Sequence, residues 1–340
     1  MQLNYRLIPS VLSAPQDPLF HCTECKVVVS LLSFTDLEHG LMLPTLRPLL
    51  RPLPLIGLST SGLLLAATLT RTPKTQTMST SSNTPSWPVT PYAPRYDKWP
   101  YTARDFTRQD PSTDDSFYSS PRFVTHIDDK AIASLSEYYY ANLPRKGRIL
   151  DFCSSWVSHY PEEVEQAAQK GELRVSGMGM NKKELDANKV LNDGRVLVDL
   201  NEKPDVAAAL EGMGMPKGSL DASTCVVSID YLTRPVAVLT SLREATRQGG
   251  SVHLAISNRC FPTKAVERWL RVDEEERLAM VGDYLWFAGW RGIEVVELSD
   301  GKVKEEDKER EQAQGSLQGF MSWMGMASRD PIWVVRAVKE

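Results

Sequence analysis

The sequence has few cysteines, and their number argues against a disulfide-stabilised secreted protein. It contains five, an odd number. Cys153, Cys225 and Cys260 lie in or beside apolar runs, where a free thiol behaves as a small hydrophobic side chain. A reducing compartment fits this usage better than secretion.

Paired metal-ligand motifs are lacking as well. Cys22 and Cys25 form one CxxC pair next to His21. A zinc site normally needs a second pair of ligands at similar spacing, and none follows. We therefore treat the pair as incidental and expect no metal site.

An excess of positive charge is missing, and so is a long apolar run. Thirty-nine Lys and Arg stand against 43 Asp and Glu, a formal net charge of -4. No basic stripe is present that would neutralise a phosphate backbone, so we expect no nucleic-acid partner. The apolar run at residues 53–69 contains Pro54, Gly57 and Gly62, whereas a membrane span needs about 20 mostly apolar residues. We expect no integral membrane span.

Acidic residues are absent from residues 42–96, where Arg and Lys punctuate a stretch rich in Leu, Ser and Thr. This composition is typical of a mitochondrial presequence. If residues 42–77 are such a segment, Met42 is a possible start and the protein is mitochondrial; otherwise we expect a cytoplasmic protein. The alternative is that residues 1–77 are an upstream extension and translation begins at Met78.

The core-forming patterns that are present begin near Phe117, although 42% of all residues are hydrophobic. Residues 78–116 are rich in Ser, Thr and Pro and have too few aliphatic residues to offset the entropy of ordering. We therefore expect residues 1–77 to lack stable structure, residues 78–116 to be a linker, and residues 117–340 to fold as one domain.

The stretch at residues 148–161 is the most informative in that domain. An apolar run ends at Asp151, small residues including Cys153 and Ser155 follow, and Pro161 opens a helix. A strand, a tight turn and a helix N-terminus form the usual geometry of a nucleotide-type cofactor site. The usual glycines are replaced by Cys153 and Ser155, so this motif alone is weak.

Similar strand ends recur further along the chain. Residues 173–180 predict a second strand ending near Gly177 and Gly179, with Asn181 as the cap of the next helix. Residues 195–201 predict a third strand. Asp199, near its end, either contacts a ligand or caps the short helix at residues 204–210.

Two later strands also end in polar residues. Residues 220–229 have few charges, as expected of a strand buried on both faces. Ser228 and Tyr231 lie at its end, and Asn258 and Arg259 follow the strand at residues 251–257. Because ligands bind beyond the carboxyl ends of parallel strands, these side chains are candidate binding residues. Asn258 and Arg259 are candidates for an anionic or carbonyl-bearing substrate.

Residues 117–128 precede the predicted helix at 129–142 and are rich in aromatic, His and Arg side chains. They either form a lid over the site or place His126 beside a helix cap, and the sequence leaves both open. Tyr118, His126 and His159 are candidate catalytic groups.

The alternation of strands and helices resembles that of class I S-adenosylmethionine-dependent methyltransferases of the type 11, or ubiquinone/menaquinone methyltransferase-like, group. It is more closely similar to a fungal branch with a degenerate glycine motif. The resemblance covers approximately residues 86–340. It rests on FYSSPRFVTHID from Phe117, LDFCSSW from Leu150 and SNRCFPTK from Ser257.

The resemblance implies a Rossmann-like, doubly wound α/β fold with a mostly parallel seven-stranded sheet whose last strand is antiparallel. It also implies S-adenosylmethionine as cofactor and methyl transfer to a small molecule. The implied contacts are Asp151, Cys153 and Ser155 in the cofactor loop, Gly177, Gly179 and Asn181 at the ribose, Asp199 and Leu200 at the adenine, and Ser228 and Tyr231 near the sulfonium.

Two other functional classes are open to this sequence. Because glycines and the usual ribose acid are replaced, a catalytically inactive methyltransferase-like protein that binds or assembles with a protein partner is the alternative. A nicotinamide-dependent reductase ranks last, because GxGxxG is absent after the first predicted strand.

Overall fold

The computed structural model describes residues 86–302 and 329–340. The predicted targeting segment at residues 42–77 and the pair Cys22 and Cys25 lie outside these residues. Among the described residues, the strands form one sheet in the order β1-β7-β8-β6-β5-β2-β3-β4. Their bounds are β1 Val89–Pro91, β2 Gly147–Phe152, β3 Leu173–Gly179, β4 Arg195–Leu197, β5 Leu220–Val226, β6 Thr246–Ser257, β7 Arg291–Ser299 and β8 Ile332–Val338.

The sheet is a Rossmann-like, doubly wound one, as the sequence predicted. Strands β4, β3, β2, β5 and β6 run parallel to their neighbours, whereas β8 is antiparallel to both β6 and β7. Strand order reverses between β2 and β5, and such switch points are where ligands bind in this architecture. The antiparallel last strand is confirmed. β1, which pairs with β7, is an eighth strand that the sequence did not predict.

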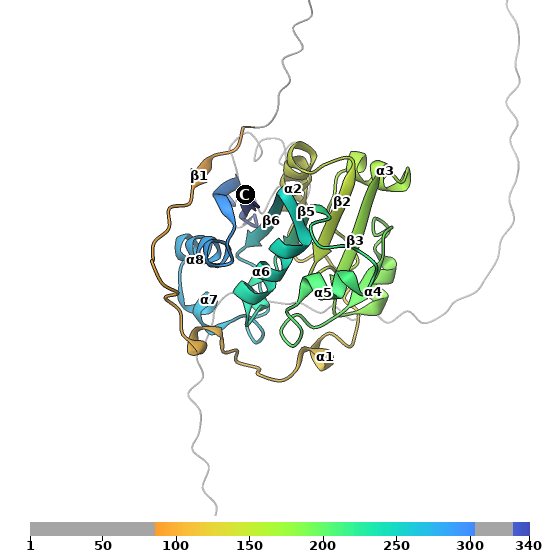
Figure 1. The fold of residues 1–340 in the computed structure, drawn as a ribbon. Helices are drawn as coiled ribbons and strands as arrows, with labels where there is room; N and C mark the ends of the chain where they lie inside the picture. The colour runs from red at the N-terminus through yellow and green to blue at the C-terminus, as the bar shows by residue number, and fades with distance from the viewer. Residues whose placement is uncertain (1–85, 303–328) are drawn as a thin grey trace, which may run out of the picture. The chain divides into compact units, whose positions relative to one another are not determined.

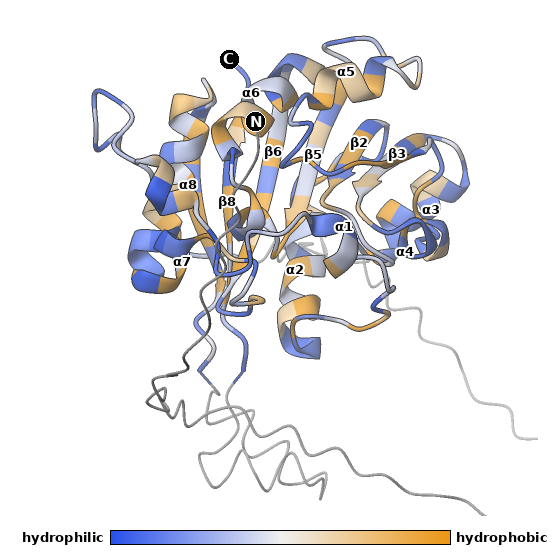
Figure 2. Ribbon diagram, turned by 90° about the horizontal axis from the view of Figure 1, so that it is seen from below, coloured by the Kyte–Doolittle hydropathy of each residue, from blue (hydrophilic) through white to orange (hydrophobic). Residues whose placement is uncertain are grey.

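Helices cover both faces of the sheet (Figures 1 and 2). The two cores that they form are separate. Helices on one face are α2 (Asp129–Asn142), α3 (Glu162–Gln169) and α4 (Lys182–Ala187), and those on the other are α5 (Val206–Glu211), α6 (Pro235–Ala245) and α8 (Glu274–Phe287). The short elements η1 (Ala103–Phe106), α1 (Asp114–Phe117), η2 (Ile229–Tyr231) and α7 (Glu267–Arg271) lie in connections.

Alternation along β2 explains why both faces are covered. Ile149 packs into the core under α2 and α3, whereas Leu150 and Phe152 pack into the core on the opposite face. All three side chains are fully buried, because successive residues of a strand point to opposite faces. Asp151, the one charged residue between Ile149 and Phe152, is therefore buried at the end of the strand.

Side-chain caps fix where several helices begin. The carboxylate of Asp128 accepts a hydrogen bond of 2.8 Å from the Ala131 amide at the start of α2. Asn181 caps α4 as predicted, and its side-chain oxygen accepts from the Lys183 amide. The cap of α5 is Asp205, so the capping role that the sequence allowed for Asp199 is wrong.

Residues 86–127 form a strap along the domain (Figure 1), which differs from the linker predicted for residues 78–116. The hydroxyls of Tyr92 and Tyr101 and the guanidinium of Arg95 converge on the fully buried carboxylate of Asp283 in α8. A few aromatic and charged anchors therefore hold the strap, with no periodic apolar face. Sequence patterns reveal helices and strands through the periodic spacing of apolar residues. The strap has no such spacing, so the sequence did not predict its contacts.

Candidate active site

A cavity of about 320 Å³ lies at the carboxyl ends of β2, β3, β4 and β5, and the strap forms part of its wall. Its position is the switch point of the sheet. The predicted site residues that line it are Tyr118, His126, Asp151, Cys153, Ser155, His159, Gly179, Asn181, Asp199, Leu200, Ser228, Tyr231 and Arg259. Segments 117–128 and 148–161, which the sequence singled out, thus meet at one place.

Gly177 and Asn258 are the predicted residues that do not line the cavity. Gly177 lies within the ladder opposite Asp151, and an added Cβ there would approach a methyl carbon of Leu191 to 2.4 Å. A glycine is therefore needed at position 177 so that Leu191 can pack against the strand. Asn258 is exposed beyond the end of β6. Both residues were predicted to bind ligand because they lie near strand ends. A position near a strand end places a residue at one edge of the sheet, but it does not show whether the residue faces the cavity.

Gly179 lines the cavity because two backbone segments approach each other closely there. A Cβ at Gly179 would lie 2.2 Å from the carbonyl oxygen of Ser154, in the loop after β2. The amide of Ser154 in turn donates to the carbonyl of Met178 at 2.6 Å. The glycine lets the loop lie directly on the end of β3, which sets the floor of the cavity.

Asp151 organises that loop. Its carboxylate accepts hydrogen bonds from the hydroxyls of Ser154 at 2.6 Å, Ser158 at 2.7 Å and Thr224 at 3.2 Å. Burial raises the pKa of Asp151 to about 6, and the three hydroxyl bonds oppose that rise. The side chain ties the loop to β5, with both of its oxygens engaged.

Residues with left-handed backbone conformation surround the cavity. Cys153, His159 and Val227 have φ of 54°, 56° and 40°, and all three line it. This conformation costs a side-chain-bearing residue about 1–2 kcal/mol and is concentrated at functional sites. Cys153 therefore has the backbone that a glycine adopts easily, although the glycine of the fingerprint is missing.

The candidate catalytic groups have shifted pKa values. Burial lowers the pKa of His159 to about 4, with the charge of His126 adding to the effect. Burial, followed by the nearby charge of Arg122, lowers the pKa of His126. Burial also raises the pKa of Tyr118. At neutral pH the cavity thus holds two uncharged imidazoles, each with a nitrogen able to accept a proton.

The two arginines in the lining differ in their partners. Arg259 is 59% exposed, and its Nε lies 2.6 Å from a carboxylate oxygen of Asp330, so the predicted substrate-binding guanidinium is already paired. Arg122, which the sequence reading missed as a candidate, has no such partner in the described chain. Arg122 lies in the aromatic segment 117–128, and this composition was the sequence feature that could have identified it as a candidate.

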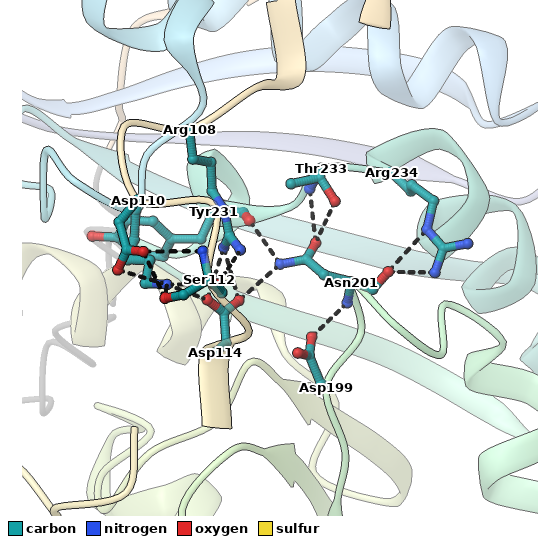
Figure 3. Close-up of polar contacts among 10 residues, drawn as sticks. Arg108, Asp110, Ser112, Asp114, Asp199, Asn201, Tyr231, Thr233 and Arg234 are labelled. Carbon is teal, nitrogen blue, oxygen red and sulfur yellow. Dashed lines mark hydrogen bonds and ion pairs between the residues drawn. The ribbon is translucent and has the colours of Figure 1, made fainter. Parts of the chain in front are cut away.

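Polar contacts anchor the strap beside the cavity (Figure 3). Asp114 accepts two hydrogen bonds from Arg108, at 2.8 and 2.9 Å, and another at 3.0 Å from Asn201. Lys264, which is fully buried, lies 3.2 Å from the same carboxylate. Asn201 follows β4, so this network connects the strap to the edge of the sheet.

At the end of β4, the carboxyl group of Asp199 lies next to apolar side chains. Asp199 accepts a hydrogen bond of 2.8 Å from the amide of Asn201, and burial raises the pKa of its carboxyl. Leu200 and Leu232 line the cavity beside it and are both almost fully buried. A flat apolar group with a polar edge suits this slot.

Residues 86–302 and 329–340 contain neither a membrane-spanning helix nor a cluster of metal ligands. No helix there is both long and apolar enough to span a bilayer. No group of three or more His, Cys, Asp or Glu side chains is placed there to hold a metal ion.

Fold and cavity together define a Rossmann-like α/β protein with a ligand-sized site at the switch point of its sheet. No protein-family model and no curated protein matches the sequence.

Similar solved structures include a phosphoethanolamine N-methyltransferase 2 of Haemonchus contortus in complex with S-adenosyl-L-methionine, at 14% identity and a TM-score of 0.38 over 61% of this chain and 52% of that one. The chain thus spans about half the length of that enzyme. A SAM-dependent methyltransferase of Archaeoglobus fulgidus is similar at 12% identity and a TM-score of 0.38, over 62% of this chain and 95% of that one. One of Thermotoga maritima, described as a possible histamine N-methyltransferase, is similar at 14% identity and a TM-score of 0.39, over 62% and 91%.

Proposed function

We propose that this domain binds S-adenosylmethionine in the cavity and transfers its methyl group to a small-molecule acceptor. The observation that carries the proposal is the pairing of two features at the switch point. One is the loop after β2, in which Cys153 has a glycine-type backbone, and the other is the acid and apolar slot formed by Asp199 and Leu200.

The residues present fit the cofactor without the usual glycines. The loop at residues 153–155 has small side chains and lines the cavity, so a ligand can approach it closely. Asp199 would accept a hydrogen bond from the cofactor's amino or hydroxyl groups, and Leu200 and Leu232 would contact the adenine faces. When bound, S-adenosylmethionine supplies an electrophilic methyl group on a sulfonium.

The chain's own residues would contribute positioning, exclusion of water and proton transfer. Tyr118 and His126 come from the strap, so an anchored strap shields the cavity wall that they form. The neutral imidazole of His126 is the better suited of the two to take a proton from an acceptor hydroxyl or amine, because the low pKa of His159, about 4, makes it a weak base. Positioning two reactants in a dry site contributes much of the catalysis for a direct displacement.

Isothermal titration of the full chain with S-adenosylhomocysteine and S-adenosylmethionine tests the proposal. We expect saturable binding of both. Leu200→Asp, which places a charge against the adenine slot, should weaken it by about tenfold or more. Leu197→Asp, at an exposed position of β4, is the matched control and should leave the affinity unchanged. Absence of heat with wild type at high micromolar ligand would instead favour the inactive binding or assembly protein.

A further inference from the structure

Arg122 is the cation of the cavity whose guanidinium has no ion-pair partner among the described residues. Its Nη1 is buried without a hydrogen-bond partner, and no ion pair within the described chain reaches its guanidinium. A buried polar group left without a partner costs about 1–3 kcal/mol. Arg259, the other arginine of the lining, is paired through its Nε with Asp330.

Aromatic rings hold the Arg122 guanidinium in place. Its central carbon lies 4.3 Å from the ring centre of Phe117, 5.5 Å from that of Phe261 and 5.9 Å from that of Tyr118. Such contacts satisfy the faces of a guanidinium but leave its N–H edges free. A fork of N–H groups matches a carboxylate or a similar oxyanion, which can accept two parallel hydrogen bonds.

No acid of the lining forms an ion pair with the Arg122 guanidinium among the described residues. Asp114 is bound by Arg108 and lies near Lys264. Asp151 accepts from three hydroxyls, as described above. Glu184 accepts a hydrogen bond from the backbone amide of Arg122 at 2.7 Å, and no ion pair with the guanidinium accompanies this bond in the described chain. Burial raises the pKa of the Glu184 carboxyl, and the charge of Arg122 opposes that rise without forming a direct contact.

The charge of Arg122 acts on the cavity itself. It adds to burial in lowering the pKa of His126, another lining residue. An approaching anion would therefore meet a positive local potential. The rings of Tyr118, Tyr231 and Phe261 face the same space, which suits a flat apolar body attached to that anion.

We propose that Arg122 binds the carboxylate of the methyl acceptor and that this acceptor is a small aromatic acid. The inference rests on the proposed function, since it names the substrate class of that same cavity. Arg122 would be a specificity-determining residue, and its stacking on Phe117 would orient the N–H fork before the substrate arrives.

The test compares 4-hydroxybenzoate with its uncharged analogue 4-hydroxybenzamide. Each is titrated calorimetrically into the full chain, with and without saturating S-adenosylhomocysteine. We expect the acid to bind wild type about tenfold or more tightly than the amide. Arg122→Gln should abolish this preference, Arg122→Lys should retain part of it, and Arg259→Gln, the matched control, should retain it fully.

Equal binding of acid and amide to wild type, or no binding of the acid, would overturn the inference without any variant. Persistence of the preference in Arg122→Gln would overturn it as well. S-adenosylhomocysteine binding is read out separately. If wild type does not bind it, the proposed function fails, whereas binding without a preference for the acid defeats only the role given to Arg122.

Discussion

The side-chain amide of Asn201 donates a hydrogen bond of 3.0 Å to the carboxylate of Asp114, which lies 87 residues earlier in the chain. The same amide nitrogen also donates to the carbonyl of Tyr231 at 3.0 Å (Figure 3). One side chain thus joins the strap, the end of β4 and the turn after β5. Each of these three segments lines the cavity, so its shape depends on this junction.

Asp114→Ala should loosen the strap. It leaves Arg108 and the fully buried Lys264 without the carboxylate that lies between them, and removing one partner of a buried ion pair costs about 3–5 kcal/mol. Urea denaturation should show this loss, and limited proteolysis should show faster cleavage near residues 103–117. Asp115→Ala, at an exposed neighbouring position, should change neither measurement. Equal stability of the two variants would contradict the role assigned to Asp114.

Gly179→Ala should distort the loop after β2. The new Cβ would lie 2.2 Å from a backbone oxygen of Ser154, so either the loop or β3 must move, at a cost of about 1–3 kcal/mol. Thermal unfolding and S-adenosylhomocysteine titration would both report the change. Gly212→Ala, where the nearest atom would lie 3.4 Å away, is the control and should be close to neutral. An unchanged Gly179→Ala protein would show that this close approach is unimportant.

Cys153 should tolerate glycine better than a β-branched residue. Its φ of 54° suits glycine, whereas valine is especially unfavourable there. We expect Cys153→Gly to remain within about 1 kcal/mol of wild type and Cys153→Val to lose about 2 kcal/mol or more. Denaturant titrations of the two variants measure the difference. The reverse order of stability would mean that packing of the thiol outweighs the backbone preference.

Asp230 predicts a specific pH dependence of stability. Its side chain is buried, its Oδ2 has no hydrogen-bond partner within the described residues, and burial raises its pKa from 3.8 to about 8. Because the folded-state pKa lies above the unfolded one, its contribution is fully present below about pH 4. It is lost as pH rises through about 8, at roughly 1.4 kcal/mol per pH unit.

Asp230→Asn removes this titration. Relative to wild type, the variant should gain stability between about pH 4 and pH 8 and show a constant difference above that range. Urea denaturation at several pH values measures it, with the exposed Asp97→Asn as control. A difference that does not change with pH would show that Asp230 titrates alike in the folded and unfolded chains.

Local patterns in the sequence predicted the sheet well because its strands are short apolar runs between turn signals. The helix expected at residues 129–142 has those bounds in the structure. For residues 263–288 the sequence predicts a long helical region with a charged break at residues 271–277, whereas in the structure α7 ends at Arg271 and α8 already begins at Glu274. β1 was missed because a strand of three exposed residues with a proline carries no periodic pattern. Its position depends on the edge of β7, which is distant in sequence.

The sequence predicted which edge of the sheet carries the site. It did not predict the individual contacts that the side chains make there. Residues directly after β2 and β5 line the cavity, since topology alone brings those strand ends together. Arg259 was selected for its position after a strand, but its charge is paired with Asp330. Arg122 and Glu184 were missed because only the packing of the strap against α4 brings them to the cavity.

The antiparallel pairing of β1 with β7 also affects how separate molecules behave. Val89, Thr90 and Pro91 lie opposite Val296, Val295 and Glu294, so this short strand covers the outer hydrogen-bonding edge of β7. A shortened protein that begins after Pro91 would present the backbone N–H and C=O groups of that edge to other copies. Bare strand edges of this kind recruit further strands, so the N-terminal segment protects the folded domain from self-association.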